Sequence, residues 1–151
     1  MEQNLSLHRE GRRNTKVLVV DDNILLASLL RMMLEDEGYE ARSAGDGLDG
    51  YTSYLLFRPD VVITDLHMPY ANGIELMENI RKQNPGVKTI YMSGDMHPFS
   101  LLLNEEKSKY PVSLLPKPFS KEELLNLLAE FGNGVKEGAL LDSPEPRRMA
   151  R

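Results

Sequence analysis

Apolar and polar residues alternate along the chain in blocks that have two different periods. Short runs of mostly apolar residues, such as KVLVV (16–20) and DVVITD (60–65), are typical of strands that are covered on both faces of a sheet. Stretches with apolar residues three or four positions apart, as in residues 24–37, predict helices. Five strands are therefore expected, at residues 16–20, 39–44, 60–65, 87–93 and 112–115.

A helix is expected after each of these strands. The apolar residues at helical spacing in the first two helices are Leu25, Leu26, Leu29, Leu30 and Met33, followed by Leu48, Tyr51, Leu55 and Leu56. The third helix is marked by Ile74, Met77 and Ile80, and the fourth covers residues 95–109. The last helix carries Leu124, Leu125, Leu127, Leu128 and Phe131.

Residues that cap or break helices place several of the helix boundaries. Asp46 is a predicted N-cap, and Pro59 ends the helix that Asp46 begins. Ser120 and Glu123 have the spacing of a capping box at the start of the last helix. Gly132 is expected to end that helix, because glycine is the usual residue just after a helix C-terminus.

Strands that alternate with helices of ten or more residues predict parallel pairing through right-handed crossovers. The expected fold class is therefore α/β, a three-layer (βα)5 sandwich with a doubly wound parallel sheet. The folded domain is expected to cover residues 15–132, between a flexible arm at 1–14 and a disordered tail at 133–151. In such sheets, functional groups gather at the C-terminal ends of the strands.

Composition narrows the classes of partner. The net charge of −5 gives no basic footprint for nucleic acid. The chain contains no cysteine, which excludes disulfides and thiolate metal sites. No apolar run approaches the roughly 20 residues that span a membrane, and the polar N-terminus lacks the apolar stretch of a secretory signal. A cytoplasmic protein without nucleic-acid or membrane partners is expected.

The ends of the expected strands carry the candidate chemistry. Asp21 and Asp22 follow the first strand, Asp65 ends the third, Ser93 ends the fourth, and Lys117 comes just after the fifth. If the sheet order brings these strands together, one crevice holds three carboxylates, a hydroxyl and an ammonium group. The alternative for the adjacent aspartates is helix capping, since they precede an apolar helical stretch.

The clustered carboxylates form a set of hard oxygen ligands of the kind that suits Mg²⁺. A cation would also compensate the repulsion between two adjacent carboxylates. One carboxylate could then act as a nucleophile toward phosphorus and form an aspartyl phosphate. Mg²⁺, with Mn²⁺ as an alternative, and Lys117 would neutralise the charge that develops on the phosphoryl oxygens.

Four segments, VLVVDD, VVITDLHMPYANGIEL, TIYMSGD and LLPKPFSKEEL, resemble the signature segments of two-component response-regulator receiver domains. The resemblance covers about residues 15–132 and implies the flavodoxin-like receiver fold. It implies that Asp65 is the phosphoacceptor and that Ser93 and Lys117 contact the phosphoryl group. It also implies that Asp21, Asp22, Asp65 and the backbone carbonyl of His67 hold the metal ion.

One position departs from the family pattern. Many receivers carry Tyr or Phe three residues before the lysine, and this aromatic follows the Ser or Thr hydroxyl inward on phosphorylation. Here the position is Leu114, so Ser93 and Leu114 are the expected switch residues and the usual aromatic readout is missing.

The function implied is a single-domain response regulator in a two-component system or phosphorelay. A histidine kinase or phosphotransfer protein would phosphorylate Asp65, and a downstream protein would read the result. The chain would be no enzyme apart from its own phosphorylation and dephosphorylation, with phosphoryl donors as its only small-molecule substrates. Two alternatives stay open: a receiver-like interaction module independent of phosphorylation, motivated by Leu114, and a small-molecule phosphatase.

Overall fold

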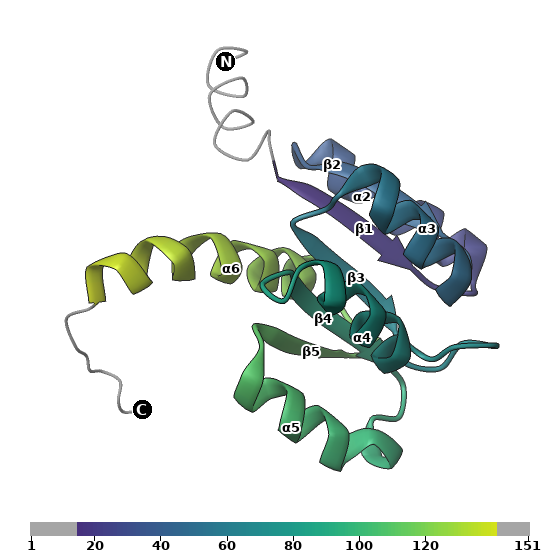
Figure 1. Cartoon of the computed structure of the whole chain (residues 1–151). Coiled ribbons are helices and arrows are strands. Elements are labelled where there is room, and N and C mark those ends of the chain that lie inside the picture. The colour runs from purple at the N-terminus through teal and green to yellow at the C-terminus, as the bar shows by residue number, and fades with distance from the viewer. Residues whose placement is uncertain (1–14, 142–151) are drawn as a thin grey trace. The chain divides into compact units, whose positions relative to one another are not determined.

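The structure, a computed structural model, describes residues 15–141, with side chains described to residue 132 (Figure 1). The expected arm at 1–14 and the final ten residues of the expected tail lie outside the described residues. The chain divides after Lys117 into two compact units. The first unit contains the whole sheet, and the second contains the last helix.

The sheet has the five strands that the apolar pattern predicts. They are β1 (Lys16–Val20), β2 (Glu40–Ala44), β3 (Val61–Asp65), β4 (Lys88–Ser93) and β5 (Val112–Pro116). Their order is β2-β1-β3-β4-β5, and every neighbouring pair is parallel. The prediction of a doubly wound parallel sheet is therefore confirmed, and β1, β3, β4 and β5 lie next to one another as the expected crevice requires.

The helices follow the strands in the expected alternation. They are α2 (Ile24–Asp36), α3 (Gly47–Phe57), α4 (Gly73–Gln83), α5 (Ser100–Lys109) and α6 (Lys121–Leu141), with a 3-10 turn η1 (His97–Phe99) before α5. The Asp46 side chain accepts a hydrogen bond from the backbone N–H of Asp49, so the predicted N-cap is present. The capping box between Ser120 and Glu123 is present as well, in both directions.

Helices cover both faces of the sheet. The chain moves from β1 to β2 in one direction and from β2 to β3 in the other, so right-handed crossovers place α2 and α3 on opposite faces. The face with α3, α4 and α5 buries a cluster that includes Leu18 of β1, Tyr54 of α3 and Tyr91 of β4. The α2 side is packed by Ala27, Leu30 and Leu34.

The apolar residues that predicted the first two helices do not all face the core. In α3 the buried side chains are Tyr54 and Phe57, whereas Leu48 and Leu56 are 74% and 79% exposed. In α2, Leu25 and Leu29 are also mostly exposed. Both helices carry apolar residues, aromatic ones included in α3, around more than half of their circumference. The helical period therefore fits two faces, and only packing against the sheet selects one.

The end of α6 also differs from the expectation. The helix continues through Gly132 and ends at Leu141, so Gly132 does not end it and the predicted boundary at 132 falls inside a helix. A glycine in a helix interior costs about 1 kcal/mol relative to alanine, a cost that a long helix can absorb. Among the described residues, no helix is long and apolar enough to cross a membrane.

Gly73 begins α4 at a point where the backbone passes very close to the end of β3. A Cβ atom at this position would lie 2.4 Å from the backbone oxygen of Asp65 and 3.2 Å from its carbonyl carbon. The N–H of Gly73 donates to the Leu66 carbonyl, which fixes the approach. A side chain here would therefore push the end of β3 away from α4.

Replacing Gly73 with alanine is expected to lower the free energy of unfolding by about 1–3 kcal/mol or more, because backbone must move to relieve the overlap. Urea denaturation checks the value. Gly86→Ala is the matched control, because its Cβ would meet only the Asn84 side chain, at 3.6 Å. Equal stability of the two variants would contradict the close approach at Gly73.

Candidate functional site

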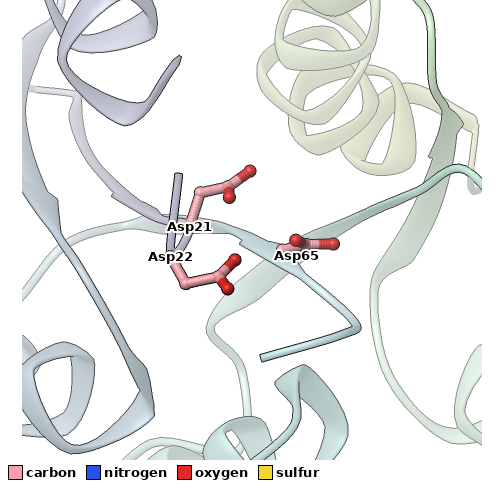
Figure 2. A group of neighbouring side chains, drawn as sticks. All are labelled: Asp21, Asp22 and Asp65. Carbon is pink, nitrogen blue, oxygen red and sulfur yellow. The ribbon is translucent and has the colours of Figure 1, made fainter. Parts of the chain in front are cut away.

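Three carboxylates meet at the C-terminal edge of the sheet. Asp21 and Asp22 follow β1, and Asp65 ends the neighbouring β3 (Figure 2). One oxygen of each carboxylate lies within 4.8 Å of one from each of the others. Asp21 and Asp65 are buried, whereas Asp22 is exposed. The structure therefore brings the predicted acidic residues together and leaves one side of the cluster open to solvent.

Backbone hydrogen bonds orient the two buried carboxylates. The N–H of Asn23 donates to Asp21 Oδ1 at 2.9 Å, and the N–H of His67 lies 3.4 Å from Asp65 Oδ1. The side chain of Asn23 caps α2 by accepting from the N–H of Leu26. The capping alternative for the adjacent aspartates is therefore not observed, because the next residue is the N-cap.

Lys117 supplies the positive charge of the site. Its Nζ lies 3.0 Å from Asp21 Oδ2 and 3.6 Å from Asp65 Oδ2. Its backbone N–H donates to the Ser93 carbonyl at 2.8 Å, which ties the end of β5 to the end of β4. Lys117 follows β5, and its side chain contacts carboxylates that follow β1 and end β3, as the sequence predicted.

Ser93 lies at the same edge of the sheet, but its hydroxyl is engaged in a local turn. Its Oγ donates to the Asp95 carbonyl and accepts from the Asp95 N–H, both at 2.9 Å. A hydroxyl has one hydrogen, so donation to any other acceptor requires that the bond to the Asp95 carbonyl be released.

His67 connects two loops beside the site. Its Nε2 lies 3.0 Å from the Asp95 carbonyl, and its ring packs edge-to-face on Phe99 at a centroid distance of 5.0 Å. The role of its backbone carbonyl as a metal ligand stays a prediction. The sequence did not indicate a role for Asp95. Its backbone carbonyl lies within hydrogen-bond distance of both Ser93 Oγ and His67 Nε2. Every residue has a backbone carbonyl, so the residue type gives no signal for such a contact.

The charges of the cluster do not balance within the described residues. Three carboxylates face one lysine ammonium. Burial, and then the neighbouring charge of Asp21, raise the pKa of Asp65 above its ordinary value, and Lys117 only partly opposes them. A divalent cation fits this donor set, because it prefers carboxylate oxygens and would offset the remaining negative charge.

Comparison with known proteins identifies the family. The family model described as the response regulator receiver domain matches residues 17–129. The chain belongs to the response-regulator receiver family. Among solved structures, the receiver is similar to the Vibrio cholerae chemotaxis protein CheY4, with a TM-score of 0.70, 31% identity, and coverage of 77% of this chain and 97% of that one. The flavodoxin-like receiver fold is thereby confirmed.

Curated relatives are longer proteins. The chain is 33% identical over 87 residues to the probable transcriptional regulatory protein TcrX of Mycobacterium tuberculosis, covering 58% of this chain and 37% of TcrX. It is 32% identical over 110 residues to the DNA-binding response regulator MtrA of Mycobacterium leprae, covering 73% of this chain and 48% of MtrA. The receiver thus spans less than half of these relatives, and the expectation of no nucleic-acid partner stays a prediction.

The raised pKa of Asp65 predicts a pH-dependent stability in the absence of divalent cations. The folded state holds the Asp65 proton more tightly than the unfolded state, so stability falls as pH rises between the ordinary pKa and the raised one. Asp65→Asn removes this cost, and at pH 7 with chelator it is expected to raise Tm by roughly 2–4 °C, the effect of about 1 kcal/mol.

Thermal unfolding of both proteins across pH checks this expectation. The advantage of Asp65→Asn should disappear once the pH falls below the ordinary pKa of aspartate, where both states bind the proton. Added Mg²⁺ should stabilise the wild type more than the variant, because the variant lacks one carboxylate of the cluster. If Asp65→Asn had a lower Tm than the wild type at pH 7, and if the difference did not change with pH, the electrostatic cost of Asp65 would be contradicted.

Proposed function

We propose that this chain accepts a phosphoryl group on Asp65 from a histidine kinase or a phosphotransfer protein and signals through protein contacts. The observation that carries the proposal is the convergence of the Asp21, Asp22 and Asp65 carboxylates, with Lys117 Nζ 3.0 Å from the first and 3.6 Å from the last. Membership of the receiver family supports the same reaction.

The proposed step is an in-line displacement at phosphorus. A carboxylate oxygen of Asp65 forms a bond to phosphorus, and the bond between phosphorus and the donor imidazole nitrogen breaks. The electron pair of the broken bond stays on the imidazole, which takes a proton from solvent. Lys117 lies within reach of Asp65 and would stabilise the negative charge on the phosphoryl oxygens. Release of Ser93 from Asp95 would free a further donor.

Asp21, Asp22 and Asp65 would hold Mg²⁺, or Mn²⁺ as an alternative, with the His67 carbonyl as a further ligand. When bound, the ion would screen the repulsion between the carboxylates and the incoming phosphoryl group. Asp21 forms the shorter ion pair with Lys117, at 3.0 Å against 3.6 Å for Asp65.

An exposed apolar row on α2 supports docking of a protein donor. Leu25, Leu29 and Met32 follow one another at intervals of four and three residues, and each is at least half exposed. The helix begins two residues after Asp22, so the row leads away from the acidic cluster. A partner that packs on this row would bring a histidine close to Asp65, which is what transfer requires.

The wider proposal is that the receiver acts as a stand-alone cytoplasmic regulator with a downstream protein target. The proposal takes CheY4 as its precedent, a chain that is matched over 97% of its length by this receiver. In this proposal the chain turns over no substrate apart from its own phosphorylation and dephosphorylation. The second candidate is a phosphorylation-independent interaction module, and Leu114, half-buried beside the core cluster, is the observation that favours it.

Incubation of the protein with acetyl phosphate and Mg²⁺ is expected to add the mass of one phosphoryl group. Asp65→Asn should abolish the gain, since it removes the nucleophile, and a chelator should lower the rate by at least roughly tenfold. Intact-mass spectrometry measures both effects. Asp49→Asn, at an exposed aspartate in the first turn of α3, is the matched control and should react like the wild type.

Undiminished labelling of Asp65→Asn would sink the assignment of the phosphoacceptor. Absence of any mass gain in the folded wild type, with acetyl phosphate and with a kinase donor, would favour the interaction module. Turnover of a generic phosphate ester would favour a phosphatase.

Leu29→Lys tests the docking row. Transfer from a phosphotransfer protein that phosphorylates the wild type should slow by at least about tenfold, because a charge replaces an exposed leucine that the partner would cover. Reaction with acetyl phosphate should stay unchanged, since the small donor needs no docking. Leu56→Lys is the control, because Leu56 is an exposed leucine on α3, on the opposite face of the sheet. Equal loss in both variants would remove the evidence for docking on α2.

A further inference from the structure

A buried polar network joins β4, α4 and α5 on one side of the sheet. The Tyr91 hydroxyl of β4 donates to Glu106 Oε1 of α5. The same oxygen lies 3.0 Å from Nη1 of Arg81, in the last turn of α4. Arg81 Nη2 donates to the Thr89 hydroxyl at 3.1 Å, and the guanidinium stacks over the Tyr110 ring with its Cζ 4.2 Å from the centroid.

The network is almost completely withdrawn from solvent. Tyr91, Arg81 and Glu106 are each at most 7% exposed. Burial, and then the hydrogen bond to Glu106, raise the pKa of Tyr91 far above its ordinary value, so its hydroxyl remains a donor. Arg81 balances the charge of Glu106. Hydrogen bonds between a buried hydroxyl and a charged acceptor are among the stronger ones in proteins.

The network attaches the C-terminal part of α5 to the sheet. Glu106 lies in the second half of the helix, which covers Ser100–Lys109. The other end of α5 follows η1, and η1 follows the turn in which Ser93 and Asp95 exchange two hydrogen bonds. The helix is thus held at two places, by the Ser93–Asp95 turn before it and by Glu106 within it.

Both attachments belong to the same strand. Tyr91 and Ser93 are two residues apart in β4, so their side chains point to the same face of the sheet. Tyr91 is in register with Leu114 of β5, the position at which many family members carry an aromatic. Leu114 has no hydroxyl, whereas Tyr91 beside it has one that reaches α5.

We propose that the bond from Tyr91 to Glu106 is a latch that holds α5 in its resting position and limits its movement when Asp65 is phosphorylated. The link to phosphorylation rests on the proposed function, because Ser93 releases the Asp95 carbonyl only if a phosphoryl oxygen takes its hydrogen. The latch itself is a property of the unphosphorylated protein. Weakening it increases the population in which α5 is displaced.

Hydrogen exchange of the unphosphorylated full chain tests the latch. Tyr91→Phe keeps the buried ring and removes only the hydroxyl. Amides of α5 are expected to exchange at least about tenfold faster in this variant, the factor that corresponds to a lost hydrogen bond to a charged group. Amides of β1 and β2 should keep the wild-type rate, because neither strand is paired with β4.

Tyr51→Phe is the matched control. Its hydroxyl is also hydrogen-bonded to a neighbouring helix, through Gln83 at 3.4 Å, but the pair is exposed and does not involve α5. Its exchange should equal that of the wild type. Wild-type exchange of α5 in Tyr91→Phe would overturn the latch. Acceleration by the same factor throughout the sheet would overturn it too, because it would show a loss of global stability.

The rate of phosphorylation by acetyl phosphate and Mg²⁺ tests the link to Asp65. Tyr91→Phe should react faster than the wild type and Tyr51→Phe, by up to about tenfold, because less work is needed to displace α5. An unchanged rate would overturn the link. A wild type that gains no phosphoryl mass would overturn the proposed function and the link with it, whereas the exchange result alone decides whether Glu106 latches α5.

Discussion

Repulsion among three carboxylates is the constraint around which this receiver is built. Parallel pairing brings Asp21, Asp22 and Asp65 to one edge of the sheet, where like charges lie within 4.8 Å of one another. Lys117 arrives from β5 and neutralises part of that charge. The remaining negative charge favours binding of a cation at this edge. Together with burial, it also raises the pKa of Asp65 above its ordinary value.

The reactive edge needs a rigid frame, and backbone contacts provide it. Gly73 lets α4 begin directly against the carbonyl of Asp65, and the N–H of Lys117 joins the ends of β4 and β5 through Ser93. These contacts fix the carboxylates and the ammonium relative to each other. The turn from Ser93 to Asp95 is different, because both of its hydrogen bonds involve a side-chain hydroxyl.

The carboxylate edge is therefore held by backbone contacts, whereas the Ser93–Asp95 turn is the part that would rearrange in the proposed switch. On the β4–α5 side, a buried tyrosine, glutamate and arginine form a polar network beside the mainly apolar core cluster. Polar networks of this kind have fixed geometry, since a displaced partner leaves a buried group unsatisfied. In the proposed switch, displacement of α5 would therefore require the hydrogen bond between Tyr91 and Glu106 to break.

The sequence by itself determined the alternation of strands and helices and the residues at the strand ends, because apolar runs, caps and breakers act locally. The apolar residues of α2 and α3 surround so much of each helix that the pattern left the buried face undecided. Gly132 did not end α6, because a local preference of about 1 kcal/mol can be outweighed. Tertiary structure alone decided that Tyr91, Glu106 and Arg81 meet, since they come from three elements and no short-range pattern joins them. Their proximity follows from sheet order and helix packing, which are long-range properties of the fold.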